Sequence, residues 1–205
     1  MGVSRYIYIY HQSSDGTYGD IHIVDAGSFV SMFSCDDNRL IVPTSSQTIK
    51  VYEGENHELV QTIASGTEVQ KISIVGNGEL FAAGGKDGIV QIYMHNGNQY
   101  EKVQEFDAGF DITGLRLNSE RLVVSGFSSD IRIYGSNGTG YWLEQTITTN
   151  EPRIYDFHAS SDLAQLLFED RDGYASTYQH INGSYSFSQA IFVNNSVHET
   201  YLDEG

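Results

Sequence analysis

The chain repeats one short sequence pattern at a nearly constant interval, and this repeat limits the possible folds more than any other feature. Five alternating runs end in a tyrosine, at Tyr10, Tyr52, Tyr93, Tyr134 and Tyr178. The successive intervals are 42, 41, 41 and 44 residues. Alternation of apolar and polar residues with a period of two is typical of a half-buried β-strand. The repeat therefore predicts a series of equivalent strands.

Other segments recur with the same period. A second alternating run follows each tyrosine, and four of these runs share a glutamine, at Gln61, Gln104, Gln145 and Gln189. Two apolar stretches joined by a polar turn precede the tyrosine run, as in 69–74 and 80–83, which is the pattern of a hairpin. Each period thus predicts four short antiparallel strands. Four strands in about 40–45 residues are typical of a propeller blade.

The predicted fold is an all-β propeller of four-stranded antiparallel blades, with about five blades or as part of a larger ring. One domain is expected over 1–205, with a partial blade from 1–29 plus 197–205. The complete blades are predicted at 30–68, 69–111, 112–153 and 154–196. Either the two chain ends combine into one three-stranded blade and close a five-bladed ring, or the chain is a piece of a larger ring, split or truncated. A ring left open exposes unpaired strand edges, which favour self-association. A β-sandwich or a series of hairpins is the alternative, but the period is long for simple hairpins.

The segment 82–93, AAGGKDGIVQIY, resembles the second-to-third strand segment of a WD40 repeat. In that family a turn aspartate precedes a strand that closes on Trp-Asp. The turn aspartate corresponds to Asp87 and Asp172 here, with Asp130 a weaker match, whereas tyrosine takes the place of the tryptophan and the aspartate after it is absent. The Gly-His pair of the family is also missing. The resemblance covers nearly the whole chain and implies a WD40-like propeller that binds partners through its loops.

Charge and cysteine content restrict the expected partners and compartment. The chain has 27 acidic and 11 basic residues, a formal net charge of −16. Such a chain repels phosphate backbones and anionic lipid, so neither nucleic acid nor membrane is expected as a partner. Cys35 is the single cysteine and gives no disulfide framework. We therefore expect a soluble, acidic, cytoplasmic repeat protein.

The sequence shows no constellation that predicts catalysis, a metal site or a cofactor. The seven histidines lack metal-ligand spacing. Three Asn-x-Ser/Thr triplets begin at Asn137, Asn182 and Asn194. The first two fall in equivalent turns, where Asn-Gly suits a hairpin, so the turn interpretation is favoured over glycosylation. A secreted or cell-surface propeller that binds glycans or proteins, and an enzyme with a channel active site, remain as alternatives.

The candidate site lies on loops, because binding residues concentrate on loops held by a rigid scaffold. In WD40-like propellers, the loops that enter each first strand share one face with the loops between second and third strands. The resemblance brings together Glu68, Lys86, Phe110, Asp111, Phe127, Arg153 and Arg171. Phe110 and Phe127 stand in otherwise polar loops as candidate exposed aromatics, and aromatic and arginine side chains are common interface anchors. We expect a non-enzymatic scaffold that docks a protein or peptide on this loop face.

Overall fold

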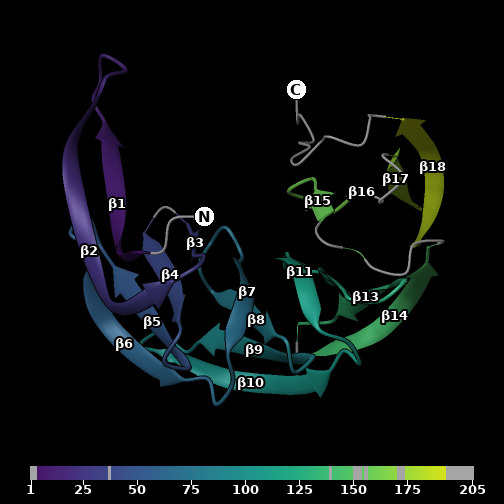
Figure 1. Cartoon of the computed structure of the whole chain (residues 1–205), viewed down its shortest axis with the longest axis horizontal. Helices are drawn as coiled ribbons and strands as arrows, with labels where there is room; N and C mark the ends of the chain where they lie inside the picture. Colours follow the sequence, from purple (N-terminus) through teal and green to yellow (C-terminus); the bar gives the residue numbers. More distant parts are fainter. Residues whose placement is uncertain are drawn as a thin grey trace.

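The computed structural model describes residues 4–36, 38–138, 140–149, 154, 157–169 and 174–192. All regular secondary structure in these residues is β-strand, and no helix there could cross a membrane. Figure 1 shows the sheets side by side along an open arc, from the N-terminal hairpin to the last sheet. The prediction of an all-β chain of four-stranded antiparallel sheets is confirmed. Residues 197–205, predicted to complete the partial blade, and Asp172 lie outside the described residues.

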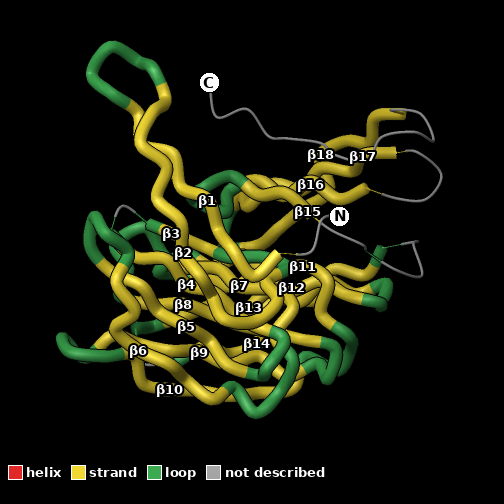
Figure 2. The backbone as a smooth tube through the Cα atoms, turned by 60° about the vertical axis from the view of Figure 1, so that its left-hand side comes forward, coloured by secondary structure: helices red, strands yellow, loops and turns green. Residues whose placement is uncertain are grey.

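The described strands form one two-stranded sheet and four four-stranded sheets. The two-stranded sheet pairs β1 (Ser4–Gln12) with β2 (Tyr18–Val30), and Figure 2 shows their connecting loop standing clear of the other sheets. The larger sheets follow in chain order. They contain β3 (Ser34–Cys35), β4 (Arg39–Thr44), β5 (Thr48–Glu53) and β6 (Glu58–Ala64); β7 (Val69–Ile74), β8 (Leu80–Gly85), β9 (Ile89–His95) and β10 (Tyr100–Asp107); β11 (Ile112–Leu117), β12 (Arg121–Gly126), β13 (Asp130–Ser136) and β14 (Tyr141–Thr148); and β15 (Phe157–Ala159), β16 (Gln165–Glu169), β17 (Tyr174–Ile181) and β18 (Ser184–Phe192).

The apolar core lies between neighbouring sheets. One cluster joins Ile41 and Val51 of the second sheet to Ile72, Phe81 and Tyr93 of the third. Three further clusters join the other neighbouring sheets in the same way. A single small sheet cannot cover both of its faces, and stacking removes those faces from water. Each sheet therefore depends on the next for its stability.

Three of the repeated tyrosines fill these layers between the sheets. Tyr52, Tyr93 and Tyr134 are 4%, 2% and 5% exposed, and the Tyr93 ring stacks on Phe81 with centroids 4.6 Å apart. Tyr10 stands at the same place in the first sheet but is 55% exposed. Among the described residues this sheet has no strand equivalent to β8, so none of them covers the Tyr10 ring as Phe81 covers Tyr93.

Three of the four recurring glutamines tie the last strand of their own sheet to the next sheet along the chain. Gln104 donates from Nε2 to the carbonyl of Tyr141 at 2.7 Å and accepts from the Tyr141 N–H at 2.7 Å. Gln61 with Tyr100 and Gln145 with Tyr185 form the same pair of bonds. A β-bulge precedes each of these glutamines in its pairing register. The amide of the glutamine side chain thus forms with the next sheet the pair of hydrogen bonds that a neighbouring strand would form.

The tyrosines held by these glutamines also fix the turns of their own sheets. The hydroxyl of Tyr141 donates to the carbonyl of Asn118 at 3.1 Å, and Tyr100 and Tyr185 donate to Gly78 and Leu163. Burial raises the pKa of all three hydroxyls to about 12, so they remain neutral donors at neutral pH. In the third, fourth and fifth sheets, one tyrosine therefore links the last strand to the turn between the first two strands.

Candidate interaction surface

A cavity of about 410 Å³ lies beside the loops that enter β7 and β11. These loops belong to the predicted loop face. Its lining comes from four of the five sheets. Apolar side chains are contributed by Phe29 of β2, Val69 of β7 and Phe127, which follows β12. Glu68 and Lys71 bring opposite charges to the same cavity. The site therefore combines aromatic surface with both charge signs.

Tight backbone packing positions the residues that enter this cavity. Gly85, at the end of β8, faces the carbonyl of Glu68 so closely that an added Cβ would lie 2.1 Å from its oxygen. Gly126, at the end of β12, meets the carbonyl of Asp111 in the same way, at 2.0 Å. Both positions require glycine, because such separations are far inside van der Waals contact. The loops that carry Glu68 and Asp111 are thus held against the sheets rather than free in solvent.

Phe127 is the exposed aromatic residue that the sequence predicts. Its side chain is 45% exposed and lines the cavity, while its N–H donates to the carbonyl of Asp111 at 2.9 Å. The backbone bond fixes the loop, so the ring is presented from a rigid support. A large apolar side chain held in this manner loses little conformational entropy when a partner covers it.

Phe110 differs from the expectation of an exposed aromatic. Its side chain is half-buried and packs against the apolar cluster between the third and fourth sheets. The centroid of its ring lies 5.4 Å from the guanidinium carbon of Arg132. The reason is again Gly126, since an added Cβ there would lie 2.4 Å from the Phe110 ring. The missing side chain leaves the space that the ring fills. Phe110 thus serves packing and not the open surface.

The structure brings together only part of the predicted site. Glu68 and Phe127 line the cavity, whereas Lys86 and Asp111 are exposed outside its lining. Arg153 and Arg171 lie outside the described residues. Sequence reasoning missed Phe29, Lys71 and Ile112, because alternation in a strand end indicates a sheet face and not a cavity wall. In the sequence, the best indication of this cavity was Phe29, an aromatic residue at the end of the first repeat.

A second cavity of about 380 Å³ lies at the opposite ends of the strands, between the third and fourth sheets. Met94, Val103 and Tyr141 contribute to its lining, together with Gln104, which also forms the inter-sheet bonds. Among the described residues no group of three or more His, Cys, Asp or Glu side chains is placed to hold a metal ion.

No protein-family model and no curated protein matches the sequence. Among solved structures, a chain in the crystal structure of the mitotic checkpoint complex is similar in fold, with a TM-score of 0.71 and 15% identity. The match covers 93% of this chain and 60% of that chain, so this chain spans less than two thirds of its length. The four-stranded antiparallel sheets, the apolar layers between them and this similarity identify the fold as a WD40-like β-propeller.

Proposed function

We propose that the chain is a non-enzymatic interaction scaffold that docks a protein or peptide at the loop-face cavity. The observation that carries this proposal is the convergence of Phe127, Phe29 and Glu68 from separate sheets on one cavity. Exposed aromatic side chains on a rigid support are typical anchors of interfaces. The similarity to a chain of a multi-protein complex agrees with this function.

The charges favour a partner segment with a basic residue beside an apolar one. Glu68 is exposed at the cavity, and the whole chain carries a net charge of −16. Complementary charge increases the rate of encounter and the selectivity of binding more than it increases affinity. The apolar residue would contact Phe127, and the basic residue would reach Glu68.

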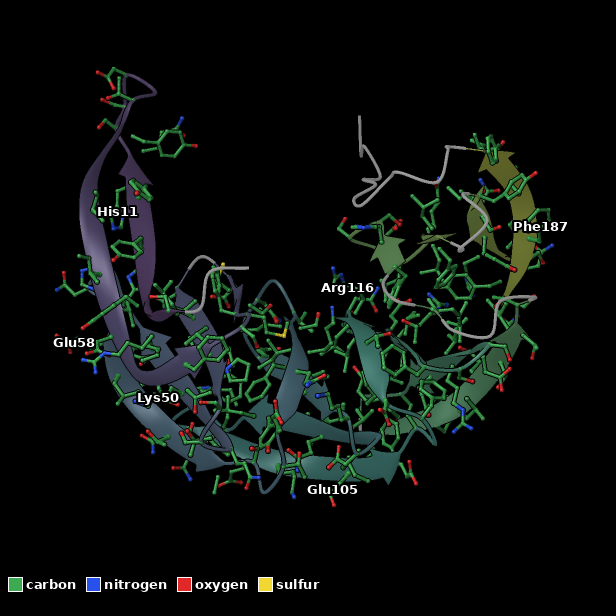
Figure 3. The ribbon with its side chains drawn as sticks, in the orientation of Figure 1. His11, Lys50, Glu58, Glu105, Arg116 and Phe187 are labelled. Carbon is green, nitrogen blue, oxygen red and sulfur yellow. The ribbon has the colours of Figure 1, made fainter. Side chains whose placement is uncertain are left out.

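Selection from a random peptide library tests this proposal with Phe127→Ala as the cavity variant. Phe187→Ala is the matched control, because Phe187 is also exposed but lies on β18, where Figure 3 labels it, and is not among the residues that line the cavity. We expect selected peptides to lose at least about tenfold in affinity for Phe127→Ala and to keep it for the control. Equal binding to both variants, or no selectable peptide, refutes the proposal.

The cytoplasm is proposed as the compartment. The Asn-x-Ser triplet that begins at Asn182 is interpreted as a hairpin turn and not as a glycosylation site. Asn182 and Gly183 form the two-residue connection between β17 and β18, and both have the positive φ that a tight hairpin turn requires, which supports this interpretation. Attached glycan on the native protein, detected by mass spectrometry, would favour the secreted alternative. Self-association through an open blade edge stays a prediction, and sedimentation at increasing concentration tests it.

A further inference from the structure

The second strand of each larger sheet begins at the same place in the repeat. Its first residue pairs with the residue that follows the repeated tyrosine, as Arg39 pairs with Glu53 and Leu80 with Met94. The four residues at this position are Arg39 of β4, Leu80 of β8, Arg121 of β12 and Gln165 of β16. The repeat therefore places an arginine at two of these four positions and a leucine at a third.

Arg39 reaches from the second sheet to the third and occupies the space between them. Its Nε donates to the Glu53 carboxylate at 2.7 Å, and one of its terminal nitrogens donates to the carbonyl of Gly78 at 3.0 Å. Its guanidinium carbon lies 5.8 Å from the centroid of the Tyr100 ring, and its side chain is 16% exposed. A carboxylate, a turn carbonyl and an aromatic ring thus hold this guanidinium group, and such an environment suits arginine.

Arg121 occupies the equivalent space between the fourth and fifth sheets. Its side chain is 18% exposed, and its Nε lies 3.9 Å from a carboxylate oxygen of Glu144. Burial raises the pKa of Tyr185 to about 12, and the positive charge of Arg121 acts against this rise, so the guanidinium group lies near that hydroxyl. Tyr185 and Tyr100 are equivalent, since each is bound by a recurring glutamine of the preceding sheet. An arginine therefore packs beside the glutamine-bound tyrosine at both contacts.

Leu80 has no such reach, and the second cavity lies at its place. This cavity of about 380 Å³ is lined by Leu80 and by Tyr141, which is the glutamine-bound tyrosine of the fourth sheet. Ser119, in the turn whose Asn118 carbonyl accepts from Tyr141, lines it as well. The cavity thus corresponds to the space that arginine fills at the other two contacts. Cavities that bind small ligands measure about 300–1,000 Å³, so this one is large enough for a long side chain.

The charges around the cavity favour a cation. Glu79 is exposed and is the one acidic residue among the described lining residues, and none of them is a lysine or an arginine. His95 also lines the cavity, with its Nε2 atom 3.9 Å from the Glu53 carboxylate. Three cations that neighbour the lining are each offset by a carboxylate: Arg39 lies 2.7 Å from Glu53, Lys102 lies 2.6 Å from Glu105, and Arg121 lies 3.5 Å from Glu120. A positive group that entered the cavity would therefore meet a complementary charge.

Two apolar side chains of the cavity remain in contact with water. Met94 and Val103 line it and are 39% and 51% exposed. Val103 is the extra residue of the β-bulge between Lys102 and Gln104, so it stands outside the regular pairing of β10 with β9. A free guanidinium compound would leave both side chains exposed, whereas an arginine within a peptide brings neighbouring residues that remove them from water. The occupant that fits this surface is therefore a segment of another protein.

We propose that this cavity between the third and fourth sheets binds an arginine side chain of another protein. The bound guanidinium group lies against the Tyr141 ring and near the Glu79 carboxylate, and its methylene stem contacts Leu80. Apolar residues beside the arginine in the partner cover the exposed side chains of the cavity. This site lies at the opposite ends of the strands from the loop-face cavity, so either site can fail without the other.

The test uses the full chain and a fluorescein-labelled peptide, Gly-Ser-Leu-Arg-Ile-Ser-Gly. Fluorescence anisotropy should show saturable binding with a Kd below about 1 mM. The same peptide with citrulline in place of arginine keeps the shape of the side chain but not its charge, and it should bind at least about tenfold more weakly. Unlabelled peptide should displace the labelled one at lower concentration than N-acetylarginine amide does, because only the peptide covers the apolar side chains.

Three variants with the same change in net charge locate the site. Leu80→Arg supplies from the chain itself the side chain that the peptide inserts, so binding should weaken by at least about tenfold. Glu79→Gln removes an exposed carboxylate of the lining and should weaken binding by about three- to fivefold. Glu58→Gln is the matched control, because Glu58 is exposed on β6, where Figure 3 labels it, and does not line the cavity. This control and Phe127→Ala should leave binding unchanged.

The urea midpoint of each variant shows that it is folded in the assay, and Glu79→Gln decides the outcome if Leu80→Arg does not fold. Four results overturn the proposal: no binding by the full chain, equal binding of the arginine and citrulline peptides, equal binding by the wild type and Glu79→Gln, or equal binding by a folded Leu80→Arg variant. Displacement by N-acetylarginine amide and by the peptide at the same concentration also overturns it, since a free guanidinium compound would then be the occupant. A dimer in sedimentation that Leu80→Arg abolishes would identify a second copy of the chain instead.

Discussion

Replacing Gln104 by alanine should weaken the contact between the third and fourth sheets by about 2–6 kcal/mol. The side chain forms two hydrogen bonds of 2.7 Å with the backbone of Tyr141, a residue only 8% exposed. Each buried polar group left without a partner costs about 1–3 kcal/mol. Gln104→Ala leaves two such groups, the N–H and the C=O of Tyr141. The expected loss is therefore large for a side chain that carries no charge.

Gln189→Ala is the matched control for this prediction. Gln189 has the same register, since it pairs with Thr177 after a bulge as Gln145 pairs with Ile133. It is exposed, and its side chain makes no hydrogen bond within the described residues. Its replacement should change the free energy of unfolding by no more than about 0.5 kcal/mol.

Urea unfolding measured by two signals distinguishes the variants. Trp142 is the single tryptophan and follows Tyr141 directly, so its fluorescence reports the joint, while far-UV circular dichroism reports all sheets. Gln104→Ala should lower the midpoint of both transitions relative to Gln189→Ala. Equal midpoints in the two variants would refute the view that the glutamine holds neighbouring sheets together.

Four further outcomes are expected. Tyr93→Ala should cost about 3–5 kcal/mol in chemical denaturation, because the ring is fully enclosed between sheets, and an unchanged midpoint would contradict this. Gel shifts with DNA or RNA at physiological salt should show no complex, given the net charge of −16. Removal of 1–11 deletes most of β1 and uncovers the cluster that it shares with the second sheet, so light scattering should detect aggregation. Burial, together with His22 and His11, lowers the pKa of His57 in the folded chain. As the pH falls below about 6.5, the unfolded chain therefore binds a proton at this histidine before the folded chain does, and the folded state loses stability. Urea midpoints of the wild type should decrease more on acidification than those of His57→Asn.

The sequence repeat predicts the sheets well because strand alternation and turn geometry depend on residues that are close together in the chain. Alternation, turn residues and a constant period each report strand and turn geometry within one unit, and the buried Tyr52, Tyr93 and Tyr134 follow from that register. The role of the recurring glutamine does not follow in the same way. Gln104 contacts Tyr141, 37 residues away in the next sheet, and periodicity within one unit carries no sign of that contact.

The candidate site is less predictable for a related reason. Phe110 and Phe127 occupy similar polar loops in the sequence, yet one is packed and the other is exposed. The difference depends on Gly126, which makes room for the Phe110 ring across a sheet edge. A cavity wall is likewise assembled from several sheets, so Phe29 and Lys71 meet only after the sheets have stacked.

The contact between the first and second sheets is built differently from the glutamine-linked contacts between the larger sheets. His22 pairs with Ile9 as Gln104 pairs with Ile92, but its ring stacks on His57 at 5.4 Å. The Nδ1 atom of His57 is buried and accepts or donates no side-chain hydrogen bond among the described residues. Two stacked imidazoles cannot replace the two directional bonds of the glutamine joints, so this joint should open first. Hydrogen exchange of β1 and β2 should therefore be faster than exchange in the larger sheets, and a peptide bound at the loop-face cavity should slow exchange near Phe29 of β2.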